Sequence, residues 1–483
     1  FLLQYEKKQF KEKLPLSSNL FKPYFFGNDD SLKTSINFRS EFYLNNNAPN
    51  QENMDVRYFS KGYSLFNSVQ FSLKSKYIYL IFEPYIKKNN FYYVENVNRY
   101  GPFSKLNDKT IRLNRINFDD NIRNSLVFFH YKGIGFGFQK TNRWWGPGFH
   151  SSLQMSNNAW PMNAKIIGTM KEIRFKNFGF EARYSFSDFQ NIDTYYNLNK
   201  FYTSLNAQLT WYGPVVLTTG FSRNYLSGGI LSFANREWKA KDAQMLVFEG
   251  FLTSNLLSNE YTIGGHDRWD QTISGYFSIS MPNRNIKLYG EVGFNDNRMF
   301  LADLISQPDH TMATIIGFKD FGSNEKNFTY GFEWTNLMIT YSIRHRGSDG
   351  TPAWYSRDIY DYSSYNQRRW AAHSGADSDD WLFYFGYISD EFFIMPSFNY
   401  ERHGVVSNRP SEVKFELRFD IRYNYKNCWF GLYYENQSEM FLGFPDYFYE
   451  DKFGNPIDNS SGIFAKSRKT KSLIFTINKS INF

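Results

Sequence analysis

The 483-residue sequence has only one cysteine, Cys428, which excludes an intramolecular disulfide and a metal cluster built on cysteine. It has no run of about 18 consecutive apolar residues, the length that a membrane-spanning helix needs. It begins with Phe1 and shows no signal peptide, so we expect a processed mature chain. If this chain meets a membrane, it therefore crosses it as β-strands or lies on its surface.

Recognisable catalytic and cofactor motifs are also missing. There is no Gly-x-Ser-x-Gly elbow, no defensible Ser-Asp-His set, no phosphate-binding glycine loop and no nucleic-acid motif. We therefore expect a protein that is not an enzyme, with no cofactor, no metal and no nucleic-acid partner. The 55 basic and 47 acidic side chains leave a formal net charge of +8, which is weak evidence for an anionic partner.

Two short segments raise the question of a metal site. The acidic run at residues 377–380 offers hard oxygen ligands for Ca²⁺, but it lacks the spacing and the glycine of a dedicated loop, so a solvated acidic turn explains it better. His266 lies beside charged residues without a second histidine at ligand spacing, which argues against zinc.

Aromatic residues, in contrast, are abundant. They make up 20% of the chain, with 36 Tyr and 51 Phe, although the mean hydropathy is only −0.55. Membrane barrels use Tyr, Trp and Phe in girdles at both bilayer interfaces, whereas a soluble core seldom needs so many rings. This composition predicts a transmembrane β-barrel.

The clearest strand pattern runs from residue 413 to residue 425. Its odd positions, from Val413 to Tyr425, are apolar or aromatic, and its even positions, from Lys414 to Asn424, are charged or polar. Because a strand points alternate side chains to opposite faces, we expect the apolar set to face lipid and the polar set to face the lumen. A soluble sandwich also permits this alternation, but its strands are usually shorter, whereas a tilted transmembrane strand takes about 9–11 residues.

Similar but less regular alternation occurs at residues 70–79 and 472–483, and the second run ends on Phe483. A terminal aromatic residue on such a strand resembles the recognition signal of outer-membrane barrels, and a closed barrel leaves no strand edge in lipid. The fold class that we predict is all-β: a transmembrane antiparallel β-barrel of about 18 strands. We place the barrel at residues 66–483, after an N-terminal periplasmic extension with a short helix at residues 1–65. We expect long loops at 87–124, 296–311, 347–380 and 441–466.

One aromatic and glycine-rich stretch lies between the strand-like runs 134–138 and 165–167. It consists of Arg143, Trp144, Trp145, Gly146, Pro147 and Gly148, and it continues to Asn157, Asn158 and Trp160. The glycines and the proline permit or fix unusual backbone angles, and the adjacent indoles have flat faces suited to stacking. An aromatic corner without a ligand explains the same residues, so both interpretations stay open.

The run RWWGPGFHSSLQMSNNAWP, residues 143–161, resembles the signature of the Wzi-type capsule-assembly family of outer-membrane proteins. Shorter echoes of the family follow in the same order at residues 265–268, 288–291, 331–335 and 373–378. The chain departs from the family pattern at Trp160, where the family has an arginine before the proline. The resemblance implies an outer-membrane barrel with a helical element near its N-terminus, which helps to hold capsular polysaccharide at the cell surface.

We therefore predict an outer-membrane protein for attachment or assembly of capsular or other surface polysaccharide. Binding an acidic, hydroxyl-rich polymer calls for aromatic platforms, basic side chains and amides. Candidate polysaccharide-binding or structural residues, besides the stretch from Arg143 to Trp160, are Arg268, Arg368 and Arg369, with Trp354, Trp370 and Trp381. Expected partners are outer-membrane lipid and lipopolysaccharide, surface polysaccharide and other envelope proteins.

Two other functions stay open. One is a porin-like channel or transporter for small solutes, and the other is an accessory barrel of a secretion or surface-assembly machine. An open polar lumen favours the channel, whereas a lumen filled by loops and aromatic residues favours attachment.

Overall fold

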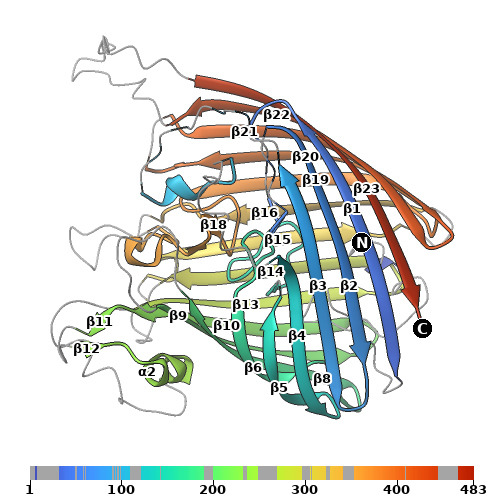
Figure 1. The fold of residues 1–483 in the computed structure, drawn as a ribbon. Coiled ribbons are helices and arrows are strands. Elements are labelled where there is room, and N and C mark those ends of the chain that lie inside the picture. Colours follow the sequence, from blue (N-terminus) through green and yellow to red (C-terminus); the bar gives the residue numbers. More distant parts are fainter. Residues whose placement is uncertain are drawn as a thin grey trace, which may run out of the picture.

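The structure of the chain, a computed structural model, describes residues 32–108, 121–189, 200–248, 269–295, 305–340, 353–443 and 466–483, with short breaks inside these ranges, and Glu6 with Lys7. Most of these residues form one closed antiparallel β-barrel (Figure 1). Its wall segments are β1 (Lys33–Asn45), β2 (Gly62–Lys74), β3 (Ile78–Asn89), β4 (Ile122–Tyr131), β5 (Ile134–Lys140), β6 (Asn163–Thr169), β7 (Ile173–Phe175), β8 (Phe178–Phe189), β9 (Lys200–Tyr212), β10 (Val216–Gly228), β13 (Trp269–Met281), β14 (Ile286–Asn295), β15 (Met312–Asp320), β16 (Phe328–Asn336), β19 (Ser378–Ile388), β20 (Phe392–His403), β21 (Glu412–Tyr425), β22 (Cys428–Leu442) and β23 (Lys466–Asn482).

Successive wall strands pair in antiparallel register, and β1 closes the barrel by pairing with β23. β6 and β7 pair with different parts of β8, so these two segments share one position in the wall. The barrel therefore has 18 strands, as the sequence predicted. Closure satisfies the backbone hydrogen bonds of all the wall strands, which a lipid environment demands.

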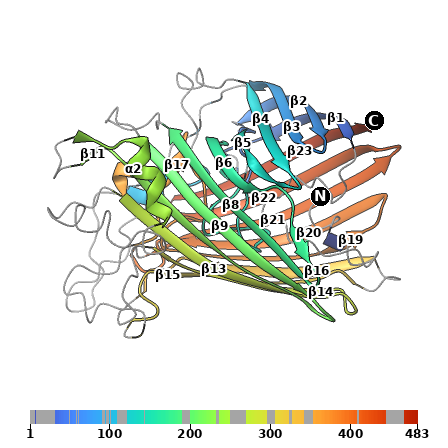
Figure 2. The same cartoon turned by 90° about the horizontal axis from the view of Figure 1, so that it is seen from below.

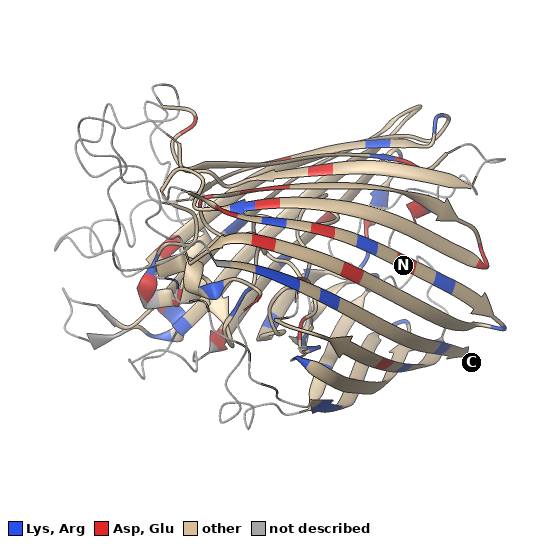
Figure 3. Ribbon diagram, turned by 90° about the horizontal axis from the view of Figure 1, so that it is seen from above, with Lys and Arg blue, Asp and Glu red and all other residues tan. Residues whose placement is uncertain are grey.

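The alternation at residues 413–425 separates the two faces of β21 as predicted. Leu417, Phe419 and Ile421 are 48%, 45% and 40% exposed on the outer face, whereas the Glu416 side chain is fully buried. Large apolar side chains are exposed in the same way on the outer face of the other wall strands. Figure 3 shows charged residues of both signs along the strands, and most of those in β21 and β22 are buried on the lumen side. The wall thus has an apolar outer face and a polar inner face.

The last strand also agrees with its prediction, since Phe475 and Ile477 are exposed on the outer face and Phe483 exchanges backbone hydrogen bonds with Thr34 of β1. The run at residues 70–79, however, is not one strand. β2 ends at Lys74, a turn follows, and Tyr79 of β3 is fully buried. Ser75, which interrupts the alternation of polar and apolar residues in this run, lies in this turn.

The barrel begins at Lys33 rather than at residue 66, so the predicted N-terminal boundary is corrected. β1 and the start of β2 lie inside the segment that we assigned to a periplasmic extension. The alternation in β1 is hard to recognise because Ser40 interrupts its outer face and Tyr43 faces inward, where it is buried. Glu6, in helical backbone, forms ion pairs with Lys287 of β14 and Lys319 of β15.

The two ends of the barrel differ. Connections of two to seven residues join strands at one end, and the C-terminus lies there, whereas the connections at the other end have eight or more residues. Short periplasmic turns and long extracellular loops are typical of outer-membrane barrels. α2 (Ala240–Met245), η3 (Leu246–Phe248), β11 (Ile230–Leu231) and β12 (Arg236–Glu237) belong to one long connection at that second end (Figure 1, Figure 2).

Three of the long connections enter the lumen with their described residues: those at 46–61, 141–162 and 337–377. The third carries η5 (Asp358–Tyr360) and the short hairpin of β17 (Ser364–Tyr365) and β18 (Arg368–Arg369), and η1 (Gly101–Lys105) lies against it. Their apolar residues form two clusters with the inner wall. One joins Trp145, Leu153 and Trp354 to β9, β14 and β15, and the other joins Phe59 and Trp160 to β1, β2 and β3. The main core of the molecule therefore lies inside the barrel.

Among the residues that the structure describes, no helix has the length and hydrophobicity needed to cross a bilayer.

Candidate functional site

The stretch that resembles the family signature folds into the lumen between β5 and β6. Trp145 is 1% exposed and stacks on Tyr202 of β9, with ring centroids 6.2 Å apart. The backbone N–H of Trp145 donates to the Met155 carbonyl at 3.0 Å, and the Ser152 hydroxyl donates to the Trp145 carbonyl. We call residues 141–162 the plug segment, because these contacts pack it against the inner wall.

Arg143 and Trp144 stabilise this segment rather than face solvent. The Arg143 guanidinium donates to the Ser185 hydroxyl of β8 at 3.2 Å and lies 5.5 Å from the Trp145 ring centroid. Burial lowers the pKa of Arg143 to about 10. The Trp144 indole N–H donates to the Gly148 carbonyl at 2.8 Å. Both side chains are buried, so they shape the plug segment and do not form an exposed sugar platform.

Glu333 of β16 holds the turn that follows Gly148. Its carboxylate accepts the backbone N–H groups of Phe149 at 2.7 Å, His150 at 3.1 Å and Ser151 at 2.7 Å. The Tyr289 hydroxyl donates to the same carboxylate at 2.7 Å. Charge-assisted hydrogen bonds of this kind are stronger than neutral ones, so Glu333 acts as the main polar tether of the plug segment.

Residues of three of the four echoes meet around this turn. Glu291 accepts the Ser274 hydroxyl at 2.7 Å and lies against Gly146, while Glu333 contacts the turn directly and Tyr289 donates to Glu333. The echo at residues 373–378 supplies His373, described below. The echo at residues 265–268, including Arg268, lies outside the described residues. Segments far apart in the sequence thus form one structural unit.

Gly148→Val should strongly reduce the amount of folded barrel. A Cβ at Gly148 would overlap the carbonyl oxygen of Ser151, inside the turn that Glu333 holds. Gly146 differs, because its φ of +102° requires glycine for conformational reasons. Heat-modifiable migration on a gel measures the folded fraction.

Gly275→Ala is the matched control, since a Cβ there meets nothing closer than the Gly220 carbonyl at 4.0 Å. A Gly148→Val barrel that folds as well as the parent and the control would show that this turn tolerates a side chain.

Asn157 and Asn158 join the three inward connections. The Asn157 carbonyl accepts the Asp55 N–H at 3.0 Å. The Asn158 side chain accepts the Asn53 N–H at 3.0 Å and donates to the Arg369 carbonyl at 3.0 Å. Both residues were predicted as candidate ligand groups, but the Asn158 amide and the Asn157 backbone carbonyl bond the backbone of neighbouring loops instead.

The remaining candidates are also largely structural. Arg368 and Arg369 are buried and donate to the carbonyls of Leu106 at 3.3 Å and Pro102 at 2.9 Å, which secures the segment that contains η1. Pro147, Trp160, Trp354 and Trp370 are buried, and Trp381 is partly buried against Trp334. The inward connections therefore use most of the predicted site residues for packing.

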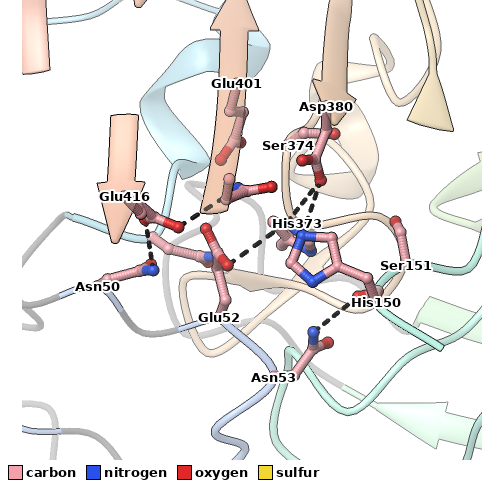
Figure 4. A network of polar contacts seen from close by, with 12 residues as sticks. Asn50, Glu52, Asn53, His150, Ser151, His373, Ser374, Asp380, Glu401 and Glu416 are labelled. Atoms are coloured by element: carbon pink, nitrogen blue, oxygen red, sulfur yellow. Dashed lines mark hydrogen bonds and ion pairs between the residues drawn. The ribbon is translucent and has the colours of Figure 1, made fainter. Parts of the chain in front are cut away.

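A buried polar cluster, which sequence analysis missed, lies where these connections meet (Figure 4). His150 Nε2 and His373 Nε2 lie 3.1 Å and 3.0 Å from the same oxygen, Oδ2 of Asp380. Glu52 Oε2 lies 3.6 Å from His373 Nε2. We call these four residues the His-carboxylate cluster. Their positions in the sequence are so far apart that no spacing pattern pointed to them.

Cations of the wall balance part of the negative charge in this cluster. Arg418 of β21 contacts Glu52 at 2.6 Å, and Lys414 of the same strand contacts Glu52 and Glu401. Burial alone raises the pKa of Glu52, but His373, Lys414 and Arg418 lower it well below its usual value. Burial alone lowers the pKa of His373, but Glu52 and Asp380 raise it to about 9.

The acidic run at residues 377–380 does not form one cation site. Asp377 accepts the backbone N–H groups of Ile339 at 3.1 Å and Ser407 at 2.8 Å, and Asp379 pairs with Arg402. Of the three, only Asp380 belongs to the His-carboxylate cluster. Since these carboxylates have separate partners, they do not form a Ca²⁺ loop. They are also buried, so the predicted solvated acidic turn is wrong.

A cavity of about 330 Å³ lies beside the cluster, between the connection at residues 46–61 and the wall strands β1, β21, β22 and β23. Arginine, amide, carboxylate and aromatic side chains line it, among them Arg39, Arg422, Asn50, Asn478, Phe59 and Tyr433. The arginines are paired with carboxylates, as in Arg57–Glu41 at 3.3 Å. This lining suits a small ligand that carries several hydroxyl groups.

Among solved structures, the chain is similar to the outer-membrane protein Wzi of Escherichia coli, described as a carbohydrate-binding β-barrel involved in group 1 capsule assembly. The two share 12% identity over 91% of this chain and 83% of Wzi, with a TM-score of 0.57. The chain also matches OpdQ of Pseudomonas aeruginosa, with 8% identity over 94% and 99% of the two chains and a TM-score of 0.43. A BenF-like porin of Pseudomonas fluorescens matches at 8% identity over 95% and 100%, also with a TM-score of 0.43. No protein-family model and no curated protein sequence matches.

At this identity, the likeness to Wzi establishes the fold. Together with the apolar outer face of the wall, it identifies the chain as an outer-membrane β-barrel and confirms the predicted fold class and location. The resemblance to the Wzi-type family is supported at the level of the fold.

Proposed function

We propose that the protein binds a capsular or other surface polysaccharide at the outer membrane and keeps it attached to the cell, without altering it chemically. The observation that carries this proposal is that the lumen is filled by protein. The stretch that resembles the Wzi-type signature fills it, together with two other long connections, and packs into apolar clusters against the wall. A porin-like channel needs a continuous aqueous path through this space instead.

The fold and the cavity give further support. The similar protein Wzi is described as carbohydrate-binding, and we extend that activity to this chain. The cavity has a volume in the range of small-ligand sites, which is about 300–1,000 Å³, and it offers aromatic rings beside amides and arginines. Sugars present apolar C–H faces and hydroxyl edges, so this combination matches their surface.

Deleting the protein from cells that make surface polysaccharide should lower the ratio of cell-bound to released polysaccharide severalfold, and the parent chain should restore it. Tyr433→Ala should restore it less well. Tyr433 lines the cavity, and loss of an aromatic contact worth about 1 kcal/mol weakens each binding event about fivefold, an effect that many contacts along a polymer then multiply. The measurement is the bound-to-released ratio at matched barrel levels.

Tyr434→Ala is the control, because Tyr434 is the next residue of β22 and pairs with Phe419 on the opposite, lipid-facing side of the wall. Deletion without any change in the ratio would reject attachment. Equal restoration by Tyr433→Ala and Tyr434→Ala would reject the cavity as the binding site.

A further inference from the structure

We infer that the His-carboxylate cluster is a binding site for a divalent transition-metal ion, with Zn²⁺ as the best match. Four ligand atoms converge there: Nε2 of His150, Nε2 of His373, Oδ2 of Asp380 and Oε2 of Glu52. The inference concerns the architecture of the lumen, and its outcome does not depend on whether the protein binds polysaccharide.

The spacing of these atoms fits a tetrahedral ion. Nitrogen and oxygen ligands lie about 2.0–2.2 Å from Zn²⁺, which places neighbouring ligand atoms about 3.3 Å apart. The observed separations of 3.0 Å, 3.1 Å and 3.6 Å lie on both sides of that value. The ligand atoms of Glu52, His150 and His373 all lie within 4.8 Å of one another, and Asp380 Oδ2 contacts both histidines.

The polar atoms of the cluster are not used up by hydrogen bonds. Nε2 of His150, both ring nitrogens of His373 and both carboxylate oxygens of Asp380 are buried without an aligned hydrogen-bond partner. Two imidazole nitrogens approach one carboxylate oxygen, an arrangement in which a shared cation satisfies all three atoms. Buried polar groups normally have a hydrogen-bond partner, so these atoms are unusual without one.

Charge in the surrounding network also favours a bound cation. Ion pairs connect the cluster through β20, β21 and β22 to Asp108 and Arg468. The network contains eight carboxylates, namely Glu52, Asp108, Asp380, Glu401, Glu412, Glu416, Glu435 and Glu439. Among the residues that the structure describes, its permanent cations are Arg99, Lys414, Arg418 and Arg468. Even with His150, His373 and His403 all charged, a negative excess would remain, whereas one divalent ion offsets half of the excess of four.

Two backbone hydrogen bonds fix the position of one ligand, His150. The backbone of His150 is held by Glu333 at its N–H and by the Asn53 amide at its carbonyl, at 3.1 Å and 2.9 Å. All four ligands come from the protein, which is the arrangement of a structural rather than a catalytic site. A bound ion would link all three inward connections to β19 of the wall.

The test uses the full chain, purified in detergent, stripped with EDTA, incubated with zinc sulfate and washed. We expect about one zinc per barrel by mass spectrometry, and an X-ray absorption spectrum with four nitrogen or oxygen neighbours at about 2.0–2.2 Å. His150→Ala and His373→Ala should each weaken zinc binding, measured by competition with a chelating dye, at least about 100-fold, because even outer-shell changes cost 10–100-fold.

His130→Gln is the control, since His130 lies in β4 with Nε2 3.2 Å from the Ser75 carbonyl, and it should leave zinc binding unchanged. Zinc far below one equivalent, a sulfur neighbour that indicates Cys428, or parent-like affinity in both alanine variants would each overturn the inference. The spectrum of the parent decides the question even where a variant fails to fold.

Discussion

Replacing residues 141–162 by Asn-Gly is expected to turn the barrel into an open channel. Lys140 and Asn163 form the last pair between β5 and β6, so a two-residue hairpin can join them without a change of register. The wall keeps its hydrogen bonds, but the lumen loses Trp145 and the rest of the plug segment. Barrels of this size leave an aqueous channel when nothing fills them, so single-channel conductance in planar bilayers should rise about tenfold or more.

The same Asn-Gly turn placed at Lys426 and Asn427 is the matched control. These two residues already connect β21 and β22 with positive φ values of 48° and 60°, and nothing enters the lumen from that turn. This control should conduct like the parent. A parent that already conducts like an open porin would contradict the filled lumen and favour the channel function.

Glu333→Ala is expected to detach the plug segment from the wall. The substitution removes the acceptor of three backbone N–H groups, two of them in the buried residues His150 and Ser151, and each buried group left unsatisfied costs about 1–3 kcal/mol. The turn from Phe149 to Ser151 should therefore open, and chymotrypsin should cleave after Phe149 in intact membranes. The temperature at which the compact gel band converts to the unfolded band should also fall.

Tyr289→Phe provides the comparison for this prediction. It removes one donor to the Glu333 carboxylate and leaves the hydrogen bonds from the three backbone N–H groups in place, so it should cost only about 0.5–1.5 kcal/mol and cause no cleavage. Glu333→Ala and Tyr289→Phe barrels that are equally stable and equally resistant to the protease would show that the tether is not needed.

The wall was predictable because one physical rule decides it. Lipid outside and polar groups inside impose a period of two on every strand, and β21 and β23 follow this rule with few exceptions. β1 was assigned to the extension because Ser40 faces lipid and Tyr43 faces the lumen, where it packs on Phe59. The exception at Tyr43 arises because an inward loop replaces water as the neighbour of the inner face.

The interior was less predictable, since its contacts join residues that are distant in sequence. The motif from Arg143 to Trp160 marked the right segment, but residue types alone left open whether its rings bind a ligand or pack together. Its partner Glu333 accepts backbone N–H groups of the segment, and the backbone N–H of Asp55 donates to the Asn157 carbonyl; no side-chain pattern reveals either contact. The His-carboxylate cluster brings together positions 52, 150, 373 and 380, and only the fold makes them neighbours.

The closure of the barrel by β1 and β23 has a consequence for its assembly. These two strands lie at opposite ends of the described chain, so their pairing closes a loop of more than four hundred residues, whereas every other wall pairing is more local. Contacts between neighbours in sequence form fastest, which makes this seam the slowest to form. Until it closes, the curved sheet is open along one side, and the inward connections can settle against it through that opening. The lumen can thus be filled before the cylinder is complete.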